Sequence, residues 1–513
     1  MTLTPGVLSA PGVGVVAEAC EEEARRLVDE AFGRPAPFTA DATALARAAR
    51  PDYWRWLAHV SGVGGCSAPI RLAGRLDTVD TTTGEVVASR STESLPDGVV
   101  YTACGNRRAA VCPACAEVYR ADTYQLVAAG LRGGKGVPDT VASHPCLFLT
   151  LTAPSFGLVH TRRTSRSGRV LPCRPRRTAQ TCPHGVDLRC PRVHDQDAAC
   201  LGTPLCLDCY DHDAHVVWNA HASELWRRTT IGVTRAVRRH ARRHGGLVRL
   251  SFGKVAEYQR RGVVHFHALV RLDGVDPTDP TQVIPPPPWA SSLLLAHLVG
   301  QAVEHTAFTT PPHPANPAGW PIAWGAQVDM RTVRATGGQI TDGAVAGYLA
   351  KYATKSTEAT GHISQRITAD TVDLYANLST HTGRLVASCW HLGNPASTVK
   401  DTLTPNRAQQ DSRPTWSRLR RWAHMLGFGG HFFTKSRRYS TTFRALRTAR
   451  TLWRRQQRTA DHLGEETTLV VGTLTYAGTG WRTTGDALLA NTAAALARQH
   501  RRTAREETAC AAA

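Results

Sequence analysis

Two β-prone segments that meet at a short polar turn constrain the fold of this chain more than any other feature. The first segment runs from Leu247 to Tyr258, the second from Gly262 to Leu272, and Gln259-Arg260-Arg261 lies between them. Two such segments joined by a three-residue turn predict an antiparallel β-hairpin. Helical and β-prone patterns alternate around the hairpin. This order favours an α+β fold with an antiparallel or mixed sheet and flanking helices.

The patterns on either side of the hairpin predict further elements. An amphipathic stretch that becomes Arg-rich predicts a long helix from about His215 to Arg243. A helix is expected near Trp289–Phe308, a strand around Trp324–Val333 and a helix from about Asp342 to Thr354. Upstream, the apolar run Cys146–Thr152 predicts another strand.

The length of 513 residues is sufficient for about three domains of ordinary size. An acidic, Ala-rich stretch at Ala17–Phe32 predicts a helix near the N-terminus. Four regions are expected: an N-terminal helical region over 1–60, a Cys-rich zinc-binding module over 61–145, a sheet domain over 146–360 with a second Cys-rich insertion at 173–210, and a basic, mostly helical region over 361–513 whose tail is disordered.

Two histidines in the second strand of the hairpin form a candidate metal site. Because strand side chains alternate between faces, His265 and His267 point to one face and Phe266 points to the other. Glu257 would pair across the hairpin and add a carboxylate. Two imidazoles and one carboxylate suit Mg²⁺ or Mn²⁺ bound together with a phosphate oxygen. The alternative is an amphipathic strand whose histidines face solvent or polar neighbours.

Two tyrosines in the expected helix 342–354 form a candidate nucleophile pair. Tyr348 and Tyr352 are four positions apart, so both phenols emerge from one helix face. Lys351 and Lys355 each follow a tyrosine by three positions, which places positive charge beside each hydroxyl. Only six of the 61 basic residues are lysines, so these two are candidates for a chemical role. The alternative is a helix whose tyrosines pack on the sheet and whose lysines face solvent.

Most of the 14 cysteines lie in the first half of the chain, in segments rich in Gly and Pro. Two Cys-x-x-Cys pairs, each with two upstream partners, suit closed tetrahedral Zn²⁺ sites of structural type. The two sets are Cys66, Cys104, Cys112 and Cys115, and then Cys182, Cys190, Cys206 and Cys209. His184 or His194 could replace a thiolate in the second set, and a redox dithiol is the competing interpretation of either pair alone.

A net charge of +20 predicts a polyanionic partner, with nucleic acid as the first candidate. Aromatic residues lie among the basic residues near position 430, where they could stack on unpaired bases. The candidates for DNA contact are Arg162, Arg163, Arg418, Arg421, Lys435, Arg437 and Arg438, with Trp416, Trp422, Phe432 and Tyr439 as the interleaved aromatic residues. For each cluster the alternative is a solvated charged face.

Several classes of protein are not expected. The sequence contains no signal-peptide pattern and no run of some 20 apolar residues, so a cytoplasmic protein without a membrane partner is predicted. A Gly-x-x-x-x-Gly-Lys-[Ser/Thr] segment is also absent from the sequence, so an intrinsic helicase is not expected.

Three of these segments resemble the motifs of the HUH endonuclease superfamily, and more closely those of actinobacterial plasmid replication initiators. An apolar strand, a His-hydrophobe-His strand and a Tyr-x-x-Lys helix follow in that order in the superfamily. Here they read Phe148-Leu149-Thr150-Leu151-Thr152, His265-Phe266-His267 and Tyr348-Leu349-Ala350-Lys351. Relaxases usually carry the tyrosine before the histidines, so the order favours an initiator. The large Cys-rich insertion between the first two motifs departs from the pattern.

The resemblance implies a palm-like sheet and rolling-circle plasmid replication. Tyr348 or Tyr352 would attack a phosphodiester and leave a 5′-phosphotyrosyl enzyme and a free 3′-OH. The metal ion that polarises this phosphate would be held by His265, His267 and Glu257. The partners would be single- and double-stranded origin DNA, a host helicase that opens the duplex and a host DNA polymerase that extends the 3′-OH. An HUH transposase, a mobilisation relaxase and a zinc-stapled DNA-binding regulator without catalysis remain as alternatives.

Overall fold

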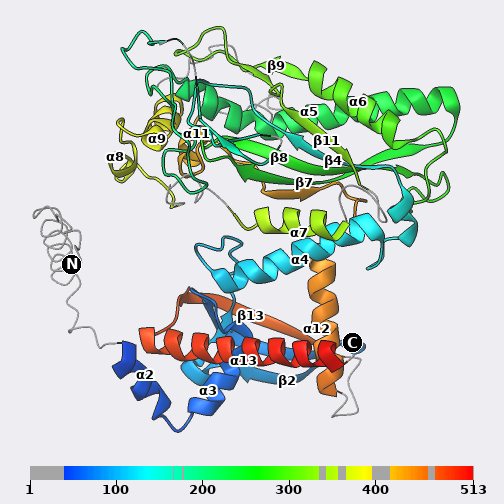
Figure 1. Cartoon of the computed structure of the whole chain (residues 1–513). Coiled ribbons are helices and arrows are strands. Elements are labelled where there is room, and N and C mark those ends of the chain that lie inside the picture. Colours follow the sequence, from blue (N-terminus) through cyan, green and yellow to red (C-terminus); the bar gives the residue numbers. More distant parts are fainter. Residues whose placement is uncertain are drawn as a thin grey trace, which may run out of the picture. The chain divides into compact units, whose positions relative to one another are not determined.

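The computed structural model describes residues 40–165, 167–175, 178, 180–333, 342–355, 365–394, 416–459 and 468–511. These residues form two compact units, one from 1–104 and 467–513 and the other from 105–466 (Figure 1). The two ends of the chain, which the sequence assigns to separate regions, thus contribute to one unit. The helix expected at Ala17–Phe32 lies outside the described residues.

The larger unit is built on a five-stranded sheet in the order β11-β4-β8-β7-β12, in which all neighbouring pairs are antiparallel. Its strands are β4 (Cys146–Leu151), β7 (Val248–Tyr258), β8 (Val264–Gly274), β11 (Val328–Thr332) and β12 (Phe433–Lys435). The central strands β7 and β8 form the expected hairpin, with Glu257 opposite His265. The antiparallel α+β class is therefore confirmed.

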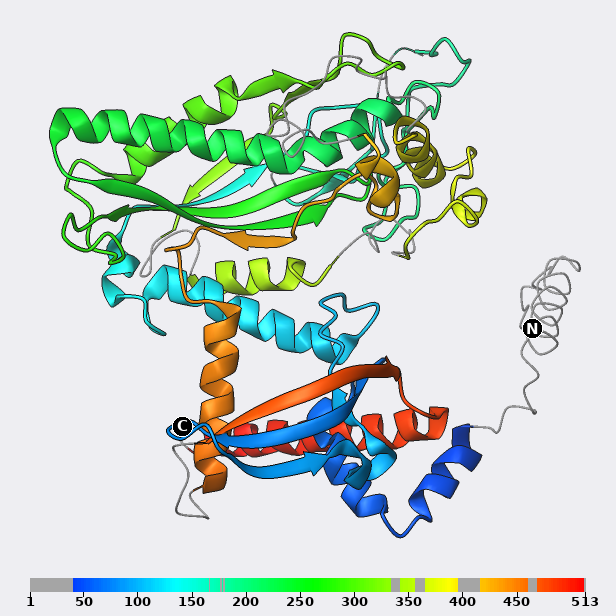
Figure 2. The same ribbon diagram turned by 180° about the vertical axis from the view of Figure 1, so that it is seen from behind.

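Helices cover both faces of this sheet (Figures 1 and 2). One face carries α5 (His212–His244) and α6 (Ser292–His305), and the other carries α4 (Pro113–Arg132) and α7 (Asp342–Tyr352). Alternation along β8 creates the two layers, because Phe266 and Ala268 enter the core with α5 whereas Leu269 packs with α4 and α7. The helices and strands expected between residues 215 and 354 are confirmed, with ends that differ by a few residues.

The remaining elements of the larger unit are short, except for one helix. The segment between β4 and α5, which includes the second Cys-rich insertion, contains β5 (Arg163–Thr164) and β6 (Val170–Leu171), which pair with each other. A second small ladder joins β9 (Ala307–Thr309) to β10 (Pro321–Ala323). The C-terminal part adds α8 (Val372–Tyr375), α9 (His381–Leu392), α11 (Arg418–Arg421) and α12 (Phe443–Thr459). No helix among the described residues has both the length and the hydrophobicity to cross a bilayer.

The smaller unit is organised around β1 (Ile70–Asp80), which pairs in antiparallel fashion with β13 (Thr468–Thr479), β2 (Val86–Ser91) and β3 (Val100–Thr102). Its helices are α2 (Ala40–Ala48), α3 (Tyr53–Val60) and α13 (Thr484–Ala511). Strand β13 was not expected in a mostly helical region; its Thr, Val and Tyr residues favour extended backbone. The tail that was expected to be disordered is helical as far as Ala511, in keeping with its Ala-rich sequence.

Candidate active site

Three potential metal ligands meet on the face of the larger sheet that also carries α7. Oε2 of Glu257 lies 3.1 Å from Nε2 of His265 and 3.1 Å from Nε2 of His267. The cross-strand pairing of Glu257 with His265 and the two-residue spacing of the histidines put all three side chains on one face. Their side chains are only 16%, 15% and 5% exposed, so the group, here called the metal triad, is partly sheltered from water.

The metal triad fits a divalent ion. Two ligand atoms that are each about 2.1 Å from one ion and at a right angle would be about 3.0 Å apart. The observed separations of 3.1 Å agree with this value. Two imidazoles and one carboxylate leave further coordination positions for water or a phosphate oxygen, as Mg²⁺ and Mn²⁺ require. The structure thus brings together all three ligands that the sequence nominates.

Two residues of β4 orient His267. The register places Thr150 opposite His267, and Oγ1 of Thr150 lies 3.1 Å from Nδ1 of the imidazole. The ring of Phe148 is parallel to the imidazole, with centroids 5.8 Å apart and an interplanar angle of 4°. If the Nδ1 proton is donated to Thr150, Nε2 keeps the lone pair that a metal needs. The sequence analysis assigned neither side chain a role at the metal site. Their two-residue spacing was the available signal, because it puts both on one face of the strand.

The members of the metal triad shift each other's pKa. Burial favours the neutral acid, but hydrogen bonds with His265 and His267 outweigh it and lower the pKa of Glu257. Burial lowers the pKa of His267, and the hydrogen bond with Glu257 opposes part of this shift. A carboxylate and a neutral imidazole are therefore favoured near neutral pH, and these are the forms that bind a metal ion.

Tyr348 reaches the metal triad from α7. Its hydroxyl oxygen lies 3.2 Å from Nε2 of His267. The ring of Tyr352 lies one helical turn on, with its centroid 4.5 Å from that of Tyr348 and 6.0 Å from that of His267. Burial and the Glu257 carboxylate raise the pKa of both tyrosines. In the absence of a compensating cation, both phenols are therefore protonated at neutral pH.

The two lysines are arranged differently from the expectation. Nζ of Lys351 is 5.7 Å and Nζ of Lys355 is 4.9 Å from the centre of the Tyr352 ring, so both lie beside one tyrosine. Lys355 follows the last turn of α7, where side chains lean back toward the preceding turn. Arg107 holds this end of the helix, because its Nη1 donates to the carbonyl oxygens of Ala353 at 3.1 Å and Lys355 at 2.8 Å.

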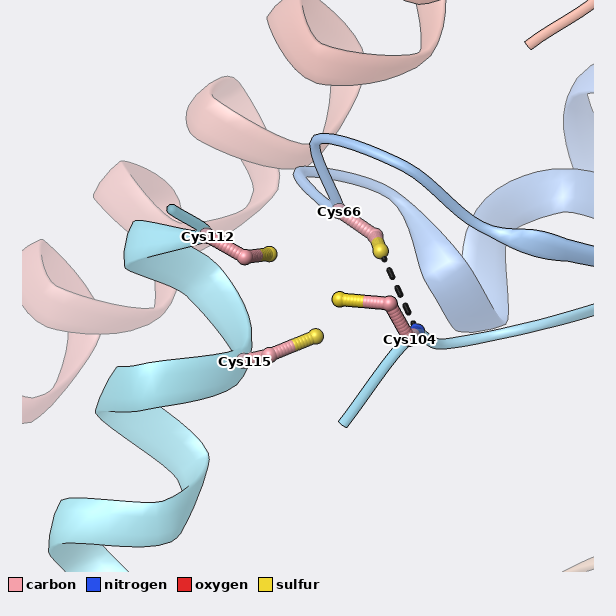
Figure 3. A group of neighbouring side chains, drawn as sticks. All are labelled: Cys66, Cys104, Cys112 and Cys115. Atoms are coloured by element: carbon pink, nitrogen blue, oxygen red, sulfur yellow. Dashed lines mark hydrogen bonds between the residues drawn. The ribbon is translucent and has the colours of Figure 1, made fainter. Parts of the chain in front are cut away.

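The four cysteines of the first expected zinc set lie close together (Figure 3). Its four sulfur atoms lie within 4.8 Å of one another, and the side chains point toward one another. The backbone N–H of Cys104 donates to Sγ of Cys66 over 3.3 Å, and Cys112 and Cys115 lie at the start of α4. Four convergent thiolates are the ligand set of a closed structural Zn²⁺ site. This group is called the Cys66 cluster below.

The second expected set is divided between two groups. One of them, the Cys182 cluster, contains Cys182, His184, Cys206 and Cys209, and the other, the His160 cluster, contains His160, Cys173, Cys190 and His194. In each cluster the ligand atoms lie within 4.8 Å of one another. The assignment of Cys190 to the Cys182 set is thereby corrected. Backbone hydrogen bonds in both directions hold Cys190 against Arg174, whereas His184 shares a tight turn with Cys182.

The path of the loop, and not the spacing of cysteines in the sequence, decides that Cys190 belongs to the His160 cluster. His184 and His194 were named as alternatives to a thiolate, and each is indeed in a cluster. His160 and Cys173 were missed. The available signal was the Cys-x-x-x-His spacing of Cys190 and His194, which defines a second half-site beside the Cys-x-x-Cys pair.

The residues expected to contact DNA differ in exposure. The exposed ones are Arg162, Arg163, Arg418, Arg421 and Arg437, and Arg438 is partly buried. Lys435 is tied to the backbone instead, since its Nζ donates to the carbonyl oxygen of Ser440 over 2.9 Å and burial lowers its pKa.

Two of the four aromatic residues near position 430 are buried and cannot stack on bases. Phe432 and Tyr439 are 5% and 0% exposed and belong to the hydrophobic cores of the larger unit. Trp416 and Trp422 pack against the core beneath α5. The segment that contains them supplies the edge strand β12, and its apolar side chains are used to close the sheet.

Comparisons with known proteins agree with the resemblance to plasmid replication initiators. Residues 52–495 match the family described as RepSA: Replication initiator protein, pSAM2. The chain is also 41% identical over 474 residues to a protein of Streptomyces ambofaciens named Replication initiator protein, and the alignment covers 90% of this chain and 94% of that relative. No solved structure matches the chain. The chain therefore belongs to the RepSA family of plasmid replication initiators.

Proposed function

We propose that this initiator is an HUH-type endonuclease that nicks one strand of origin DNA with Tyr348 as the first nucleophile. One observation carries the proposal: the hydroxyl of Tyr348 lies 3.2 Å from the same His267 nitrogen that lies 3.1 Å from Glu257. A nucleophile and three metal ligands therefore converge on one point, where a scissile phosphate could bind. Membership of the replication-initiator family supports plasmid origin DNA as the substrate.

The proposed reaction exchanges one phosphate ester for another. Oη of Tyr348 attacks the phosphorus, the new bond joins this oxygen to phosphorus, and the bond between phosphorus and the 3′ oxygen breaks. The phenol releases its proton to solvent and the 3′ oxygen takes up one, which leaves a 3′-OH and a 5′-phosphotyrosyl enzyme. Because an ester bond is kept, the reverse reaction can rejoin the strand without a nucleotide cofactor.

The residues around the phosphate have distinct roles in this proposal. Glu257, His265 and His267 would hold Mg²⁺ or Mn²⁺, and such an ion would polarise the phosphate and offset the carboxylate charge. Glu257 helps to raise the pKa of Tyr348, so this compensation favours the phenolate. Lys351 adds positive charge on the exposed side of the helix, where charge develops on the phosphate oxygens.

Tyr352 is proposed as the nucleophile of a later strand transfer. Its ring is 4.5 Å from that of Tyr348 and is flanked by two lysine ammonium groups. A second phenol one turn away on the same helix face could receive the displaced strand while the first remains esterified. The Cys66 and Cys182 clusters are proposed as structural Zn²⁺ sites, on the basis of their convergent thiolates.

A nicking assay tests the proposal. Full-length protein is incubated with supercoiled plasmid that carries its own origin, in the presence of Mg²⁺ or Mn²⁺. Tyr348→Phe should abolish relaxed circles, because it removes the attacking oxygen and little else. Tyr352→Phe should still nick but should impair rejoining. Tyr476→Phe is the matched control, since Tyr476 is 68% exposed on β13 and should behave like the wild type.

Two outcomes would contradict the proposal. Nicking by the Tyr348→Phe, Tyr352→Phe double variant at the wild-type rate would exclude a tyrosine nucleophile on α7. Tight origin binding without nicking under either metal would favour a regulator that binds DNA without catalysis.

A further inference from the structure

The His160 cluster stands apart from the candidate active site and from the two zinc sets that the sequence predicts. Three of its residues, Cys173, Cys190 and His194, are at most 6% exposed. The described residues of the surrounding segment between β4 and α5 have little regular structure beyond the paired residues of β5 and β6. A segment with so few backbone ladders needs another source of order, and a metal ion is the usual one in Cys- and His-rich loops.

The distances within the His160 cluster match the edges of a zinc tetrahedron. Two nitrogen ligands that are each about 2.05 Å from Zn²⁺ are about 3.3 Å apart, and a nitrogen and a sulfur ligand are about 3.6 Å apart. Nδ1 of His160 and Nε2 of His194 are 3.3 Å apart, and Sγ of Cys190 is 3.4 Å from the same His194 nitrogen. The cluster therefore has the size as well as the chemistry of a Cys₂His₂ site.

Two further contacts orient the ligands. The backbone N–H of Thr161 donates to Sγ of Cys173 over 3.2 Å, which stabilises a thiolate. Sγ of Cys200 lies 3.4 Å from Nδ1 of His194, on the side of the ring away from the other ligands. A proton on this nitrogen can be donated to Cys200 and leaves Nε2 free to bind metal. Cys200 is thus a positioning residue and not a fifth ligand.

The His160 cluster also supports one wall of a large cavity. The cavity has a volume of about 650 Å³, and His160, Arg162 and Arg174 are among the residues that line it. Arg260 and Arg261, from the turn between β7 and β8, also line the cavity. None of the described residues that line the cavity is acidic. A cavity with four arginines and no carboxylate suits a polyanion such as a nucleic-acid strand.

Hydrogen bonds connect the His160 cluster to this turn. The backbone of His160 is bonded to Gly202 and Thr203, each over 2.9 Å. Gly202 has a φ of +87° and packs so closely on Arg260 that an added Cβ would lie 2.5 Å from its carbonyl carbon. Arg260 in turn donates to the carbonyl oxygen of Gln196 over 2.6 Å. A metal ion that fixes His160 would therefore also fix the loop against the turn.

The cavity adjoins the metal triad. Gln259 lines the cavity, and its Nε2 lies 3.4 Å from Nδ1 of His265. Thr152 also lines it and directly follows the end of β4, two residues beyond Thr150. Nε of Arg174 is buried and has no hydrogen-bond partner among the described residues, so a donor remains for a ligand.

We propose that the His160 cluster binds a structural zinc ion of its own, and that this ion holds the arginine-lined cavity in shape for single-stranded DNA next to the scissile phosphate. The zinc site stands on its own geometry. The identity of the cavity's ligand rests on the proposed function, because a nicking site needs a channel for the unpaired strand.

Zinc content tests the first part. The full-length protein is purified without chelator, and zinc per chain is measured by plasma mass spectrometry for the wild type, Cys190→Ser, Cys182→Ser and the double variant. Separate sites predict that each single variant loses one zinc and that the double variant loses two. A single shared site, as the sequence suggested, predicts that all three variants lose only one, and this result would overturn the proposal.

Two further variants serve as controls, one for loss of zinc through misfolding and one for an incorrect choice of ligands. Cys190→His keeps four ligands and should retain the zinc that Cys190→Ser loses. Cys200→Ser should also retain it, because Cys200 contacts only the far nitrogen of His194. Loss of one zinc in Cys200→Ser, or none in Cys190→Ser, would contradict the assigned ligands.

Single-strand binding tests the second part. The probe is a fluorescent thymidine oligonucleotide of about 15 nucleotides, and anisotropy is measured in a Tyr348→Phe background without added Mg²⁺, so that nicking does not matter. Arg162→Ala and Arg174→Ala should each weaken binding several-fold and reduce the slope of log affinity against log salt by about 0.7. Arg169→Ala is the matched control, because Arg169 is an exposed arginine of the same loop and does not line the cavity.

The outcomes separate the cavity from general electrostatics. If Arg169→Ala weakens binding as much as Arg162→Ala, the strand follows a diffuse basic surface and the cavity proposal fails. If neither Arg162 nor Arg174 affects binding while the enzyme still nicks, the cavity proposal fails and the proposed function remains.

Discussion

Replacement of Asp273 by Asn tests how β8, the strand that carries both metal-triad histidines, is held in place. Asp273 lies near the end of β8, and its Oδ1 accepts a hydrogen bond from Nε of Arg271 at 2.6 Å and lies 2.8 Å from Nδ1 of His144. All three side chains are 0% exposed. Arg271 also donates to the carbonyl oxygens of Gly130 on α4 and Tyr439 after β12. The network therefore joins β8 to two distant segments.

The expected cost of Asp273→Asn follows from this burial. Removal of one partner from a buried ion pair leaves the other charge uncompensated and costs about 3–5 kcal/mol. The larger unit spans residues 105–466. A domain of this size has an unfolding entropy of about 0.8 kcal/mol per kelvin, so Tm should fall by about 4–7 °C. The same change at Asp329, whose pair with Arg331 is about half exposed, should cost no more than about 1 kcal/mol.

Differential scanning fluorimetry and urea unfolding of the two variants measure this difference. Asp273→Asn should be clearly destabilised while Asp329→Asn stays within about 1.5 °C of the wild type. Equal Tm values for the two variants would refute the reasoning, because they would mean that the buried network does not support β8.

Three other variants have defined outcomes. Burial lowers the pKa of Lys254 to about 7, so the free energy of unfolding of the wild type should increase as pH rises from about 7 to 10.5. Urea unfolding should show that Lys254→Met is more stable than the wild type at pH 7 and lacks this increase. Burial lowers the pKa values of His212 and His381 to about 4, so the free energy of unfolding should decrease as pH drops from 6.5 toward 4. If His381→Gln lost stability as steeply as the wild type over this pH range, the account would be contradicted. Glu257→Gln should weaken Mn²⁺ binding at least about tenfold in calorimetry, and unchanged affinity would exclude this ligand.

The candidate active site could be predicted largely because it depends on short-range geometry. The hairpin turn sets the register of β7 and β8, so the opposition of Glu257 and His265 follows from counting residues. The helical period likewise puts Tyr348 and Tyr352 on one face. The contact between Tyr348 and His267 spans 81 residues, and no local pattern predicts it. Only the resemblance to the HUH superfamily, in which the tyrosine motif and the histidine motif belong to one site, indicated that these residues would meet.

The less accurate predictions concern contacts between distant segments and loops without regular structure. β13 pairs with β1 along its whole length although about 400 residues separate them, and its sequence alone does not identify a partner. Phe432 has a basic, surface-like context, but it becomes buried because β12 completes the sheet. Cys190 could pair with either Cys-rich segment by spacing, and only the path of the loop decides. Lys254, one of the few lysines, packs over the ring of Phe266 and not in the active site.

The most direct test of the central claim is to identify the amino acid that becomes linked to DNA. The wild-type protein is allowed to cleave a single-stranded origin oligonucleotide, and the adduct is digested with trypsin and nuclease and analysed by tandem mass spectrometry. The sequence separates the two candidates, since trypsin yields 335–351 with Tyr348 and 352–355 with Tyr352. The account predicts a nucleotide phosphate on Tyr348 after the first cleavage. A phosphate on another residue, or cleaved DNA with no linked peptide, would contradict it.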